Sequence, residues 1–205
     1  MITTPSERIN VNGIVVPVTR EWDDIPARLD IRTTSMRESW ELMDKFTEHF
    51  LELFNVSKYA VRLPNVHNLR SWFVWKYTKH FEKVEVADWL DDGRRPSRQL
   101  NSDDVKFMLE ELTIDDELDI RESVEEGVRY SGPLKMKKLH VESRDLLTLE
   151  AILNMDCEQL YFHFGTITYK DLNGIIKKWL TGGLKNLKYI GLYCKCYRLL
   201  LVLML

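Results

Sequence analysis

Cysteine, histidine and acidic residues are the side chains of this 205-residue chain that could hold a metal ion or carry out acid–base catalysis. Cys194 and Cys196 supply two ligands two positions apart, whereas a structural zinc site needs four. The five histidines are scattered without an H-E-x-x-H pattern, and no G-x-S-x-G or phosphate-binding glycine loop occurs. Adjacent carboxylates such as Asp103 and Asp104 fall at expected helix starts or in loops, where capping or solvation explains them. The sequence therefore predicts no catalytic residue, no metal and no cofactor, and an enzyme of unidentified type is the least favoured reading.

Composition and charge indicate which classes of partner the chain is expected to bind. The formal net charge is −3, so no global positive field draws the chain to nucleic acid or to anionic lipid. Apolar residues make up 44% of the chain and charged residues 30%, a balance typical of a folded globular protein. The apolar run Leu199–Leu205 is far shorter than the roughly 20 residues that cross a bilayer as a helix. With three cysteines and no visible secretory segment, we expect a reducing compartment, cytoplasmic or nuclear, and no membrane or nucleic-acid partner.

A recurring pattern of apolar residues, which we call an apolar line, predicts the strands of the scaffold that would position any binding residues. Its pattern resembles L-x-x-L-x-L, as in Met136-x-x-Leu139-x-Val141, and it recurs at intervals of 21 to 34 residues. The fourth positions of the six lines are Tyr59, Val84, Leu118, Leu139, Leu160 and Ile190. Leucine-rich repeats of about 20–29 residues each give one strand and one helix or turn, so these lines predict an irregular version of that architecture.

Segments with helical periodicity alternate with the apolar lines. The predicted helices are residues 35–54, 65–80, 100–112, 144–155 and 168–180. Thr168 and Asp171 have the spacing of a capping box at the start of the last helix, and Thr181-Gly182-Gly183 is predicted to end it with a glycine in the left-handed conformation. Because each crossover contains a helix, the strands are expected to pair in parallel. At the amino terminus, Asn12-Gly13 between β-branched runs predicts a β-hairpin. The predicted fold is α/β: an irregular leucine-rich-repeat-like solenoid with a mainly parallel sheet flanked by helices, preceded by an N-terminal β-hairpin.

Side chains alternate across a strand, so the polar positions of each line emerge on the face opposite the core. In the first three lines these positions are mostly charged, whereas in the last three they become rich in histidine and tyrosine. Tyrosine is enriched at the energetic centres of protein interfaces. The predicted protein-binding residues are His140, Tyr161, His163, Tyr189 and Tyr193. The alternative is that flanking helices or the C-terminal tail cover them.

Four segments resemble a known family. They are Leu147–Tyr161 (LTLEAILNMDCEQLY), Thr166–Gly183 (TITYKDLNGIIKKWLTGG), Asn186–Ile190 (NLKYI) and the N-terminal Ile9–Val18 (INVNGIVVPV). The first three resemble the type 2 F-box-associated domain, which is found in the expanded F-box families of nematodes. The fourth resembles the segment that joins the F-box to this domain.

The resemblance implies the substrate-binding region of an F-box protein in an SCF-type E3 ubiquitin ligase, with a protein substrate as partner. The F-box itself is expected upstream of Ile9 and is not found here, so binding of a Skp-type adaptor is expected only if an F-box is supplied upstream. The alternative is a stand-alone interaction module without a ligase role. The predicted domains are a hairpin and linker at 1–20, an F-box-associated domain at 21–194 and an atypical apolar tail at 195–205.

Overall fold

The structure is a computed structural model that divides into two compact units, Met1–Ser57 and Lys58–Leu205. It describes the backbone of residues 7–11, 14–20, 29–31, 36–63, 69–87, 99–163, 165, 167–193 and 198–201. Side chains are described for residues 39–63, 69–87, 99–163, 165 and 167–192. The predicted domain boundaries at residues 20 and 194 do not coincide with this division and stay a prediction.

The first unit holds a small antiparallel sheet and one long helix. Strand β2 (Ile14–Arg20) pairs with β1 (Glu7–Val11) on one side and with β3 (Leu29–Ile31) on the other. Val11 lies opposite Ile14, while the predicted turn residues Asn12 and Gly13 lie outside the described residues. Helix α1 (Met36–Leu53) agrees with the helix predicted at 35–54.

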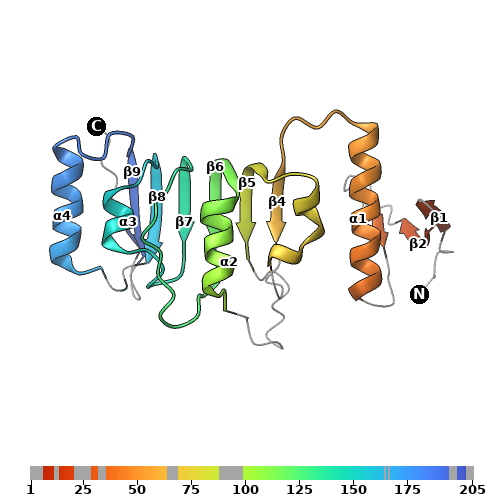
Figure 1. Cartoon of the computed structure of the whole chain (residues 1–205), viewed down its shortest axis with the longest axis horizontal. Coiled ribbons are helices and arrows are strands. Elements are labelled where there is room, and N and C mark those ends of the chain that lie inside the picture. The colour runs from red at the N-terminus through yellow and green to blue at the C-terminus, as the bar shows by residue number, and fades with distance from the viewer. Residues whose placement is uncertain are drawn as a thin grey trace. The chain divides into compact units, whose positions relative to one another are not determined.

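The second unit is built on a seven-stranded sheet (Figure 1). Its strands are β4 (Ala60–Leu63), β5 (His80–Val86), β6 (Thr113–Ile120), β7 (Lys138–Val141), β8 (Gln159–His163), β9 (Tyr189–Tyr193) and β10 (Arg198–Leu201). They lie side by side in chain order, and each pair from β4 to β9 is parallel. β10 pairs antiparallel with β9. The fold is thus α/β with a mainly parallel sheet, as predicted.

The apolar lines set the register of this sheet. The residues aligned across β5 to β9 are Val84, Leu118, Leu139, Leu160 and Ile190. The prediction was wrong only for the first line, because Val61 rather than Tyr59 aligns with Val84. A shift of two residues keeps the same side chains on the same face, so the alternating pattern alone does not distinguish the two alignments.

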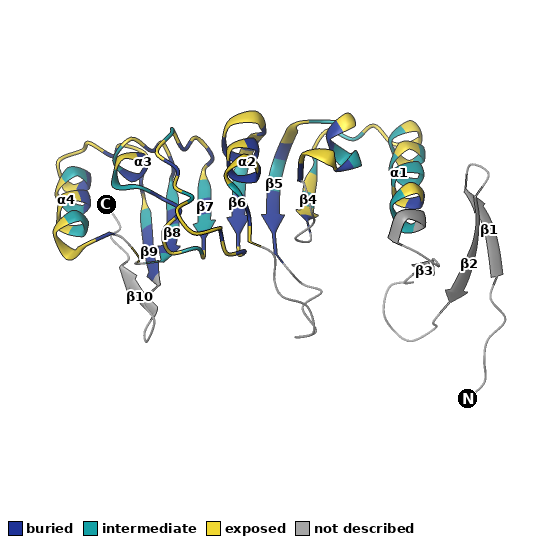
Figure 2. Cartoon of the chain, turned by 60° about the horizontal axis from the view of Figure 1, so that its bottom comes forward, coloured by how far each residue is buried: buried dark blue, intermediate teal, exposed yellow. Residues whose placement is uncertain are grey.

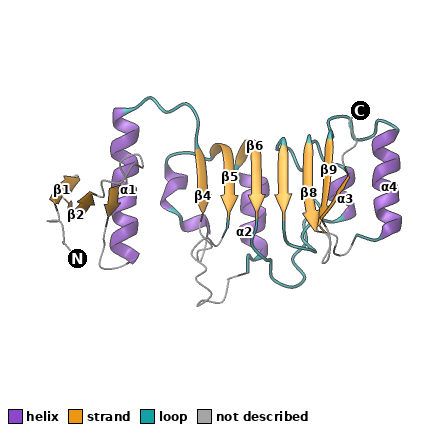
Figure 3. Cartoon of the chain, turned by 180° about the vertical axis from the view of Figure 1, so that it is seen from behind, coloured by secondary structure: helices purple, strands orange, loops and turns teal. Residues whose placement is uncertain are grey.

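Helices α2 (Ser102–Lys106), α3 (Leu149–Leu153) and α4 (Tyr169–Leu180) lie on one side of the sheet (Figures 1 and 3). α4 begins with the predicted capping box, in which Thr168 and Asp171 each accept from the other's backbone. Its carboxyl end is closed by Gly182, which has a φ of 78°, as the predicted glycine cap requires.

Two predicted helices differ from the structure. Of the helix predicted at 65–80, residues 65–68 lie outside the described residues, and residues 69–76 form two short 3₁₀ turns, η1 (Leu69–Ser71) and η2 (Phe73–Lys76), in place of one helix. In this segment Trp75 packs into the core. The centroid of its ring lies 5.5 Å from that of Phe81 and 5.1 Å from that of Phe107, both in edge-on contacts. The predicted helix does not form, because its aromatic and β-branched residues are weak helix formers and the packing of Trp75 favours the short turns instead.

The helix predicted at 144–155 is shortened to α3, with Thr148 as its N-cap. The Leu146 carbonyl accepts from the Tyr130 amide at 2.7 Å, and Thr148 donates back to Tyr130 at 3.0 Å, so this stretch is extended. The helix predicted at 100–112 is present as α2, capped by Asn101, followed by the π-helical turn η3 (Phe107–Glu111).

The core lies between the sheet and these helices, where the buried residues concentrate (Figure 2). The apolar residues of β5 to β9 that align across the sheet are nearly all fully buried: Val84, Leu118, Leu139 and Leu160 have 0% exposure. Ile175 and Trp179 of α4 are also buried, and the Trp179 indole donates to the Leu187 carbonyl at 2.6 Å.

We expect Leu139→Ala to lower the free energy of unfolding by about 2–5 kcal/mol, because it empties a fully buried site in a central strand. Urea unfolding followed by tryptophan fluorescence measures this change. Lys137→Ala, which alters an exposed residue beside the same strand, is the matched control and should change stability by less than about 0.5 kcal/mol. Equal effects of the two substitutions would contradict the assignment of the core.

Candidate functional site

The parallel register brings the predicted binding residues to the sheet face opposite the core. His140 of β7 lies opposite Tyr161 of β8, and Tyr161 lies opposite Gly191 of β9. Since side chains alternate along a strand, the polar residues between buried Leu139 and Val141 or between Leu160 and Phe162 share one face. Figure 3 shows the strands from this side, and no described helix of the second unit lies over them.

Three of the predicted residues touch and form what we call the aromatic patch: His140, Tyr161 and Tyr189. The rings of Tyr161 and Tyr189 have centroids 4.8 Å apart, and those of His140 and Tyr161 are 5.8 Å apart. These spacings lie in the range of favourable aromatic contacts. Gly191 makes room for this packing, because a Cβ at that position would lie 2.5 Å from Cδ1 of Tyr161. All three rings stay partly exposed.

The other two predicted residues belong to the neighbouring row of the face. His163 lies opposite Tyr193 in the register of β8 and β9, two residues beyond Tyr161. The side chain of Tyr193 lies outside the described residues, so only its backbone position is known. The register thus places these two residues beside the aromatic patch, and their role in binding stays a prediction.

A row of ion pairs continues the aromatic patch across the other strands. Arg121 donates to Asp119 Oδ2 through Nε at 2.9 Å and through Nη2 at 2.8 Å. His140 Nδ1 lies 3.0 Å from Asp119 Oδ1, and Arg62 donates to Glu85 at 2.8 Å. We call Arg62, Glu85, Asp119 and Arg121 the ion-pair row. Its charges are already matched within the sheet.

The two carboxylates of this row are buried although they stand on the open face. Glu85 is 4% exposed and Asp119 is 1% exposed, because the longer basic side chains cover them. Burial alone raises the pKa of Asp119, but hydrogen bonds from His140 and Arg121 outweigh it and hold the pKa below its usual value. The same bond to Asp119 raises the pKa of Arg121. Sequence alternation puts these residues on this face but does not reveal that the carboxylates are buried.

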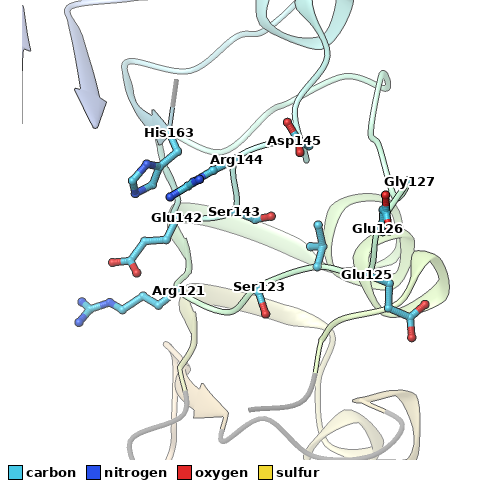
Figure 4. A pocket seen from close by; sticks show the side chains of 11 residues that line it. Arg121, Ser123, Glu125, Glu126, Gly127, Glu142, Ser143, Arg144, Asp145 and His163 are labelled. Carbon is cyan, nitrogen blue, oxygen red and sulfur yellow. The ribbon is translucent and has the colours of Figure 1, made fainter. Parts of the chain in front are cut away.

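A cleft of about 360 Å³ lies at the carboxyl ends of β6, β7 and β8. Its lining comes from the segments that follow these strands: Arg121, Ser123, Val124, Glu125, Glu126, Gly127, Glu142, Ser143, Arg144, Asp145 and His163 (Figure 4). Gly165 keeps two of these segments together, since a side chain there would collide with the Arg144 carbonyl. Sequence periodicity did not indicate this cleft, because its loops have no period.

Among the described side chains, the histidines, the carboxylates and Cys157 are the groups that could hold a metal ion or act as a nucleophile. Within that part of the chain, no group of three or more His, Cys, Asp or Glu residues is arranged to hold a metal ion. Burial, together with the nearby Asp156 carboxylate, raises the pKa of the Cys157 thiol to about 12, so this thiol is a poor nucleophile. Cys194 and Cys196 lie outside the described residues. Among the helices described, none has the length and apolar character needed to cross a membrane.

Comparison with protein families matches residues 132–192 to the F-box-associated family. The match contains the whole aromatic patch and strands β7 and β8, together with α3 and α4. Comparison with curated proteins found no match, and comparison with solved structures found none either. The match supports the resemblance drawn from the C-terminal segments.

The buried Asp119 predicts a pH-dependent contribution to stability. Because the folded-state pKa lies below the unfolded value of about 3.9, the ionised form stabilises the fold above that pH, and this is lost as the pH falls through the folded-state pKa. At about pH 7 we expect Asp119→Asn to lower the free energy of unfolding by about 1.5–3 kcal/mol, and the deficit should shrink towards about pH 3.

Urea unfolding at several pH values measures this, with the exposed Glu126→Gln as the control variant. A deficit that is the same at low and neutral pH would show that the charge of Asp119 is not what stabilises the fold.

Proposed function

We propose that this chain is a non-catalytic protein-recognition module and that its binding surface is the open face of the sheet, centred on the aromatic patch. The observation that carries the proposal is the contact of Tyr161 with Tyr189 and His140 on a face over which no described helix of the second unit lies. Partly exposed tyrosines combine apolar area with a polar tip, as is common at the centres of interfaces. His163 and Tyr193 would extend this surface by one row.

The architecture supports the same proposal. Strands β4 to β9 follow one another in chain order, each parallel to the last, with helices or turns on one side. We interpret this as a leucine-rich-repeat-like solenoid, preceded by an N-terminal β-hairpin, since stacked repeats of this kind use their open sheet face for binding. The proposed domains keep the predicted boundaries at 1–20, 21–194 and 195–205.

The family match gives the proposal its cellular context. Residues 132–192 match an F-box-associated family and contain His140, Tyr161, His163 and Tyr189. We infer that these residues belong to the substrate-binding region of an SCF-type ubiquitin ligase receptor, with a cytoplasmic or nuclear protein as its substrate. A stand-alone interaction module without a ligase role is the second candidate, because the family match does not include an F-box.

We expect Tyr161→Ala with Tyr189→Ala to reduce partner capture by at least about tenfold, since truncation of an interface-centre tyrosine costs on the order of 2 kcal/mol. Affinity capture from cell extract, quantified by mass spectrometry, measures the loss. Tyr169→Ala is the matched control, because Tyr169 is 84% exposed but lies on α4. The melting temperature should change little in either variant; a large drop in the double variant would assign the two tyrosines to the core instead.

The ligase role has its own test. A Skp-type adaptor should be retained by this chain only when an F-box is joined upstream of it, because no described surface is assigned to adaptor binding. Pull-down with the purified adaptor, with and without the added F-box, measures this. Adaptor-bound protein that captures substrate but never promotes its ubiquitination would favour the stand-alone module.

A further inference from the structure

Asp119 connects the ion-pair row to the aromatic patch. Its Oδ2 accepts hydrogen bonds from Nε and Nη2 of Arg121 at 2.9 and 2.8 Å, and its Oδ1 lies 3.0 Å from Nδ1 of His140. Burial raises the pKa of Asp119, but the hydrogen bonds from His140 and Arg121 outweigh burial and lower it, so the carboxylate is ionised at neutral pH. An ionised carboxylate can only accept hydrogen bonds, and therefore Nδ1 of His140 is the donor.

This hydrogen bond fixes the orientation of the His140 ring. With Nδ1 directed at Asp119, the other ring nitrogen, Nε2, lies 3.9 Å from Oε1 of Glu142. That distance is too long for a hydrogen bond. Of these two neighbouring carboxylates, Asp119 is therefore the one that holds the ring, whereas the charge of Glu142 acts on Arg121 and contributes to raising its pKa.

The His140 ring in turn borders Tyr161, the central residue of the aromatic patch. The two ring centroids are 5.8 Å apart and the ring planes meet at 58°. On the next strand Tyr161 contacts Tyr189 at 4.8 Å and leans over Gly191, where a Cβ would lie 2.5 Å from its Cδ1. Tyr161 thus has a neighbour on each flanking strand. A side chain that is held in place before binding loses less conformational entropy when a partner binds.

We propose that Asp119 is a positioning residue of the aromatic patch: through its hydrogen bond with His140 it holds the Tyr161 ring in the place where a partner meets it. Buried ion pairs add little net stability compared with apolar packing, whereas this one selects a single orientation of a ring at the binding surface. The inference rests on the proposed function, because it names what keeps the proposed binding surface in order.

The protonation of the His140 nitrogens tests the inference without any partner. In a chain with isotope-labelled histidine, long-range proton–nitrogen NMR spectra should show that Nδ1 is protonated. In Asp119→Asn the amide oxygen should face Arg121, which can only donate, so the amide NH₂ should face Nδ1 of His140. At about pH 8, above the range in which histidine ordinarily titrates, Nδ1 should then be unprotonated in the variant and still protonated in the wild type.

Glu85→Gln is the matched control for this experiment. It neutralises the other buried carboxylate of the ion-pair row, whose hydrogen bond comes from Arg62, and it should leave Nδ1 of His140 protonated. Thermal unfolding checks that each variant is folded. An unprotonated Nδ1 in the wild type, or an Nδ1 that stays protonated in Asp119→Asn at the same pH, would overturn the inference.

A double-mutant cycle tests the effect on binding. The probe is a peptide selected on the wild-type chain from a phage-displayed random library, chosen because Tyr161→Ala abolishes its binding. Asp119→Ala should raise the dissociation constant about two- to tenfold, the cost of ordering one side chain on binding, and Asp119→Asn should act less in the same direction. In a His140→Ala background the same substitutions should have no further effect, because Asp119 acts through His140. Fluorescence anisotropy measures the dissociation constants, and Glu85→Gln should bind as the wild type does.

The outcomes separate this inference from the proposed function. If the Asp119 variants bind the peptide as tightly as the wild type, or if their effects add to that of His140→Ala, the inference is overturned. The loss of the same peptide in Tyr161→Ala would still keep the sheet face as the binding surface. If no selected peptide depends on Tyr161, the proposed function is overturned and the inference falls with it, whatever the His140 spectra show.

Discussion

The parallel backbone ladder of the second unit is the constraint on which the other features depend. Its register aligns Val84, Leu118, Leu139, Leu160 and Ile190, and so places one row of buried residues on every strand from β5 to β9. The residues one position further along necessarily emerge on the other face. A slip of one residue would exchange the two faces, which the loss of apolar burial forbids. The core therefore determines which side chains are available to a partner.

The open face is divided by its chemistry. Towards β5 and β6 it is an ion-pair row in which Glu85 and Asp119 are buried under arginine, so forming the row satisfies its charges internally. Buried ion pairs add little net stability compared with apolar packing, but removing one partner is costly. Towards β8 and β9 the same face carries Tyr161 and Tyr189, whose rings pack together over the gap left by Gly191. Because of this contrast, the proposed binding surface is centred on the aromatic end rather than on the charged end.

Local sequence rules predicted the elements in which local chemistry decides the structure. The Thr168–Asp171 capping box, the left-handed Gly182 and the apolar lines from β5 onwards follow from neighbouring residues alone. Where long-range contacts decide the local structure, the predictions were wrong. Trp75 packs on Phe81 and Phe107, and the helix predicted there does not form. Backbone hydrogen bonds with Tyr130 keep Leu146 and Thr148 extended, so the next predicted helix is shorter. The aromatic patch was predictable from alternation, whereas the cleft depends on how three aperiodic loops meet, which no periodic pattern encodes.

Hydroxyl-radical footprinting of the chain, alone and in complex with a captured partner, tests most directly whether the open sheet face is the binding surface. The account predicts that the modification rates of Tyr161 and Tyr189 fall in the complex, while that of Tyr169 on α4 stays the same. Protection of Tyr169 with unchanged rates at Tyr161 and Tyr189 would place the partner on the helical side and contradict the account.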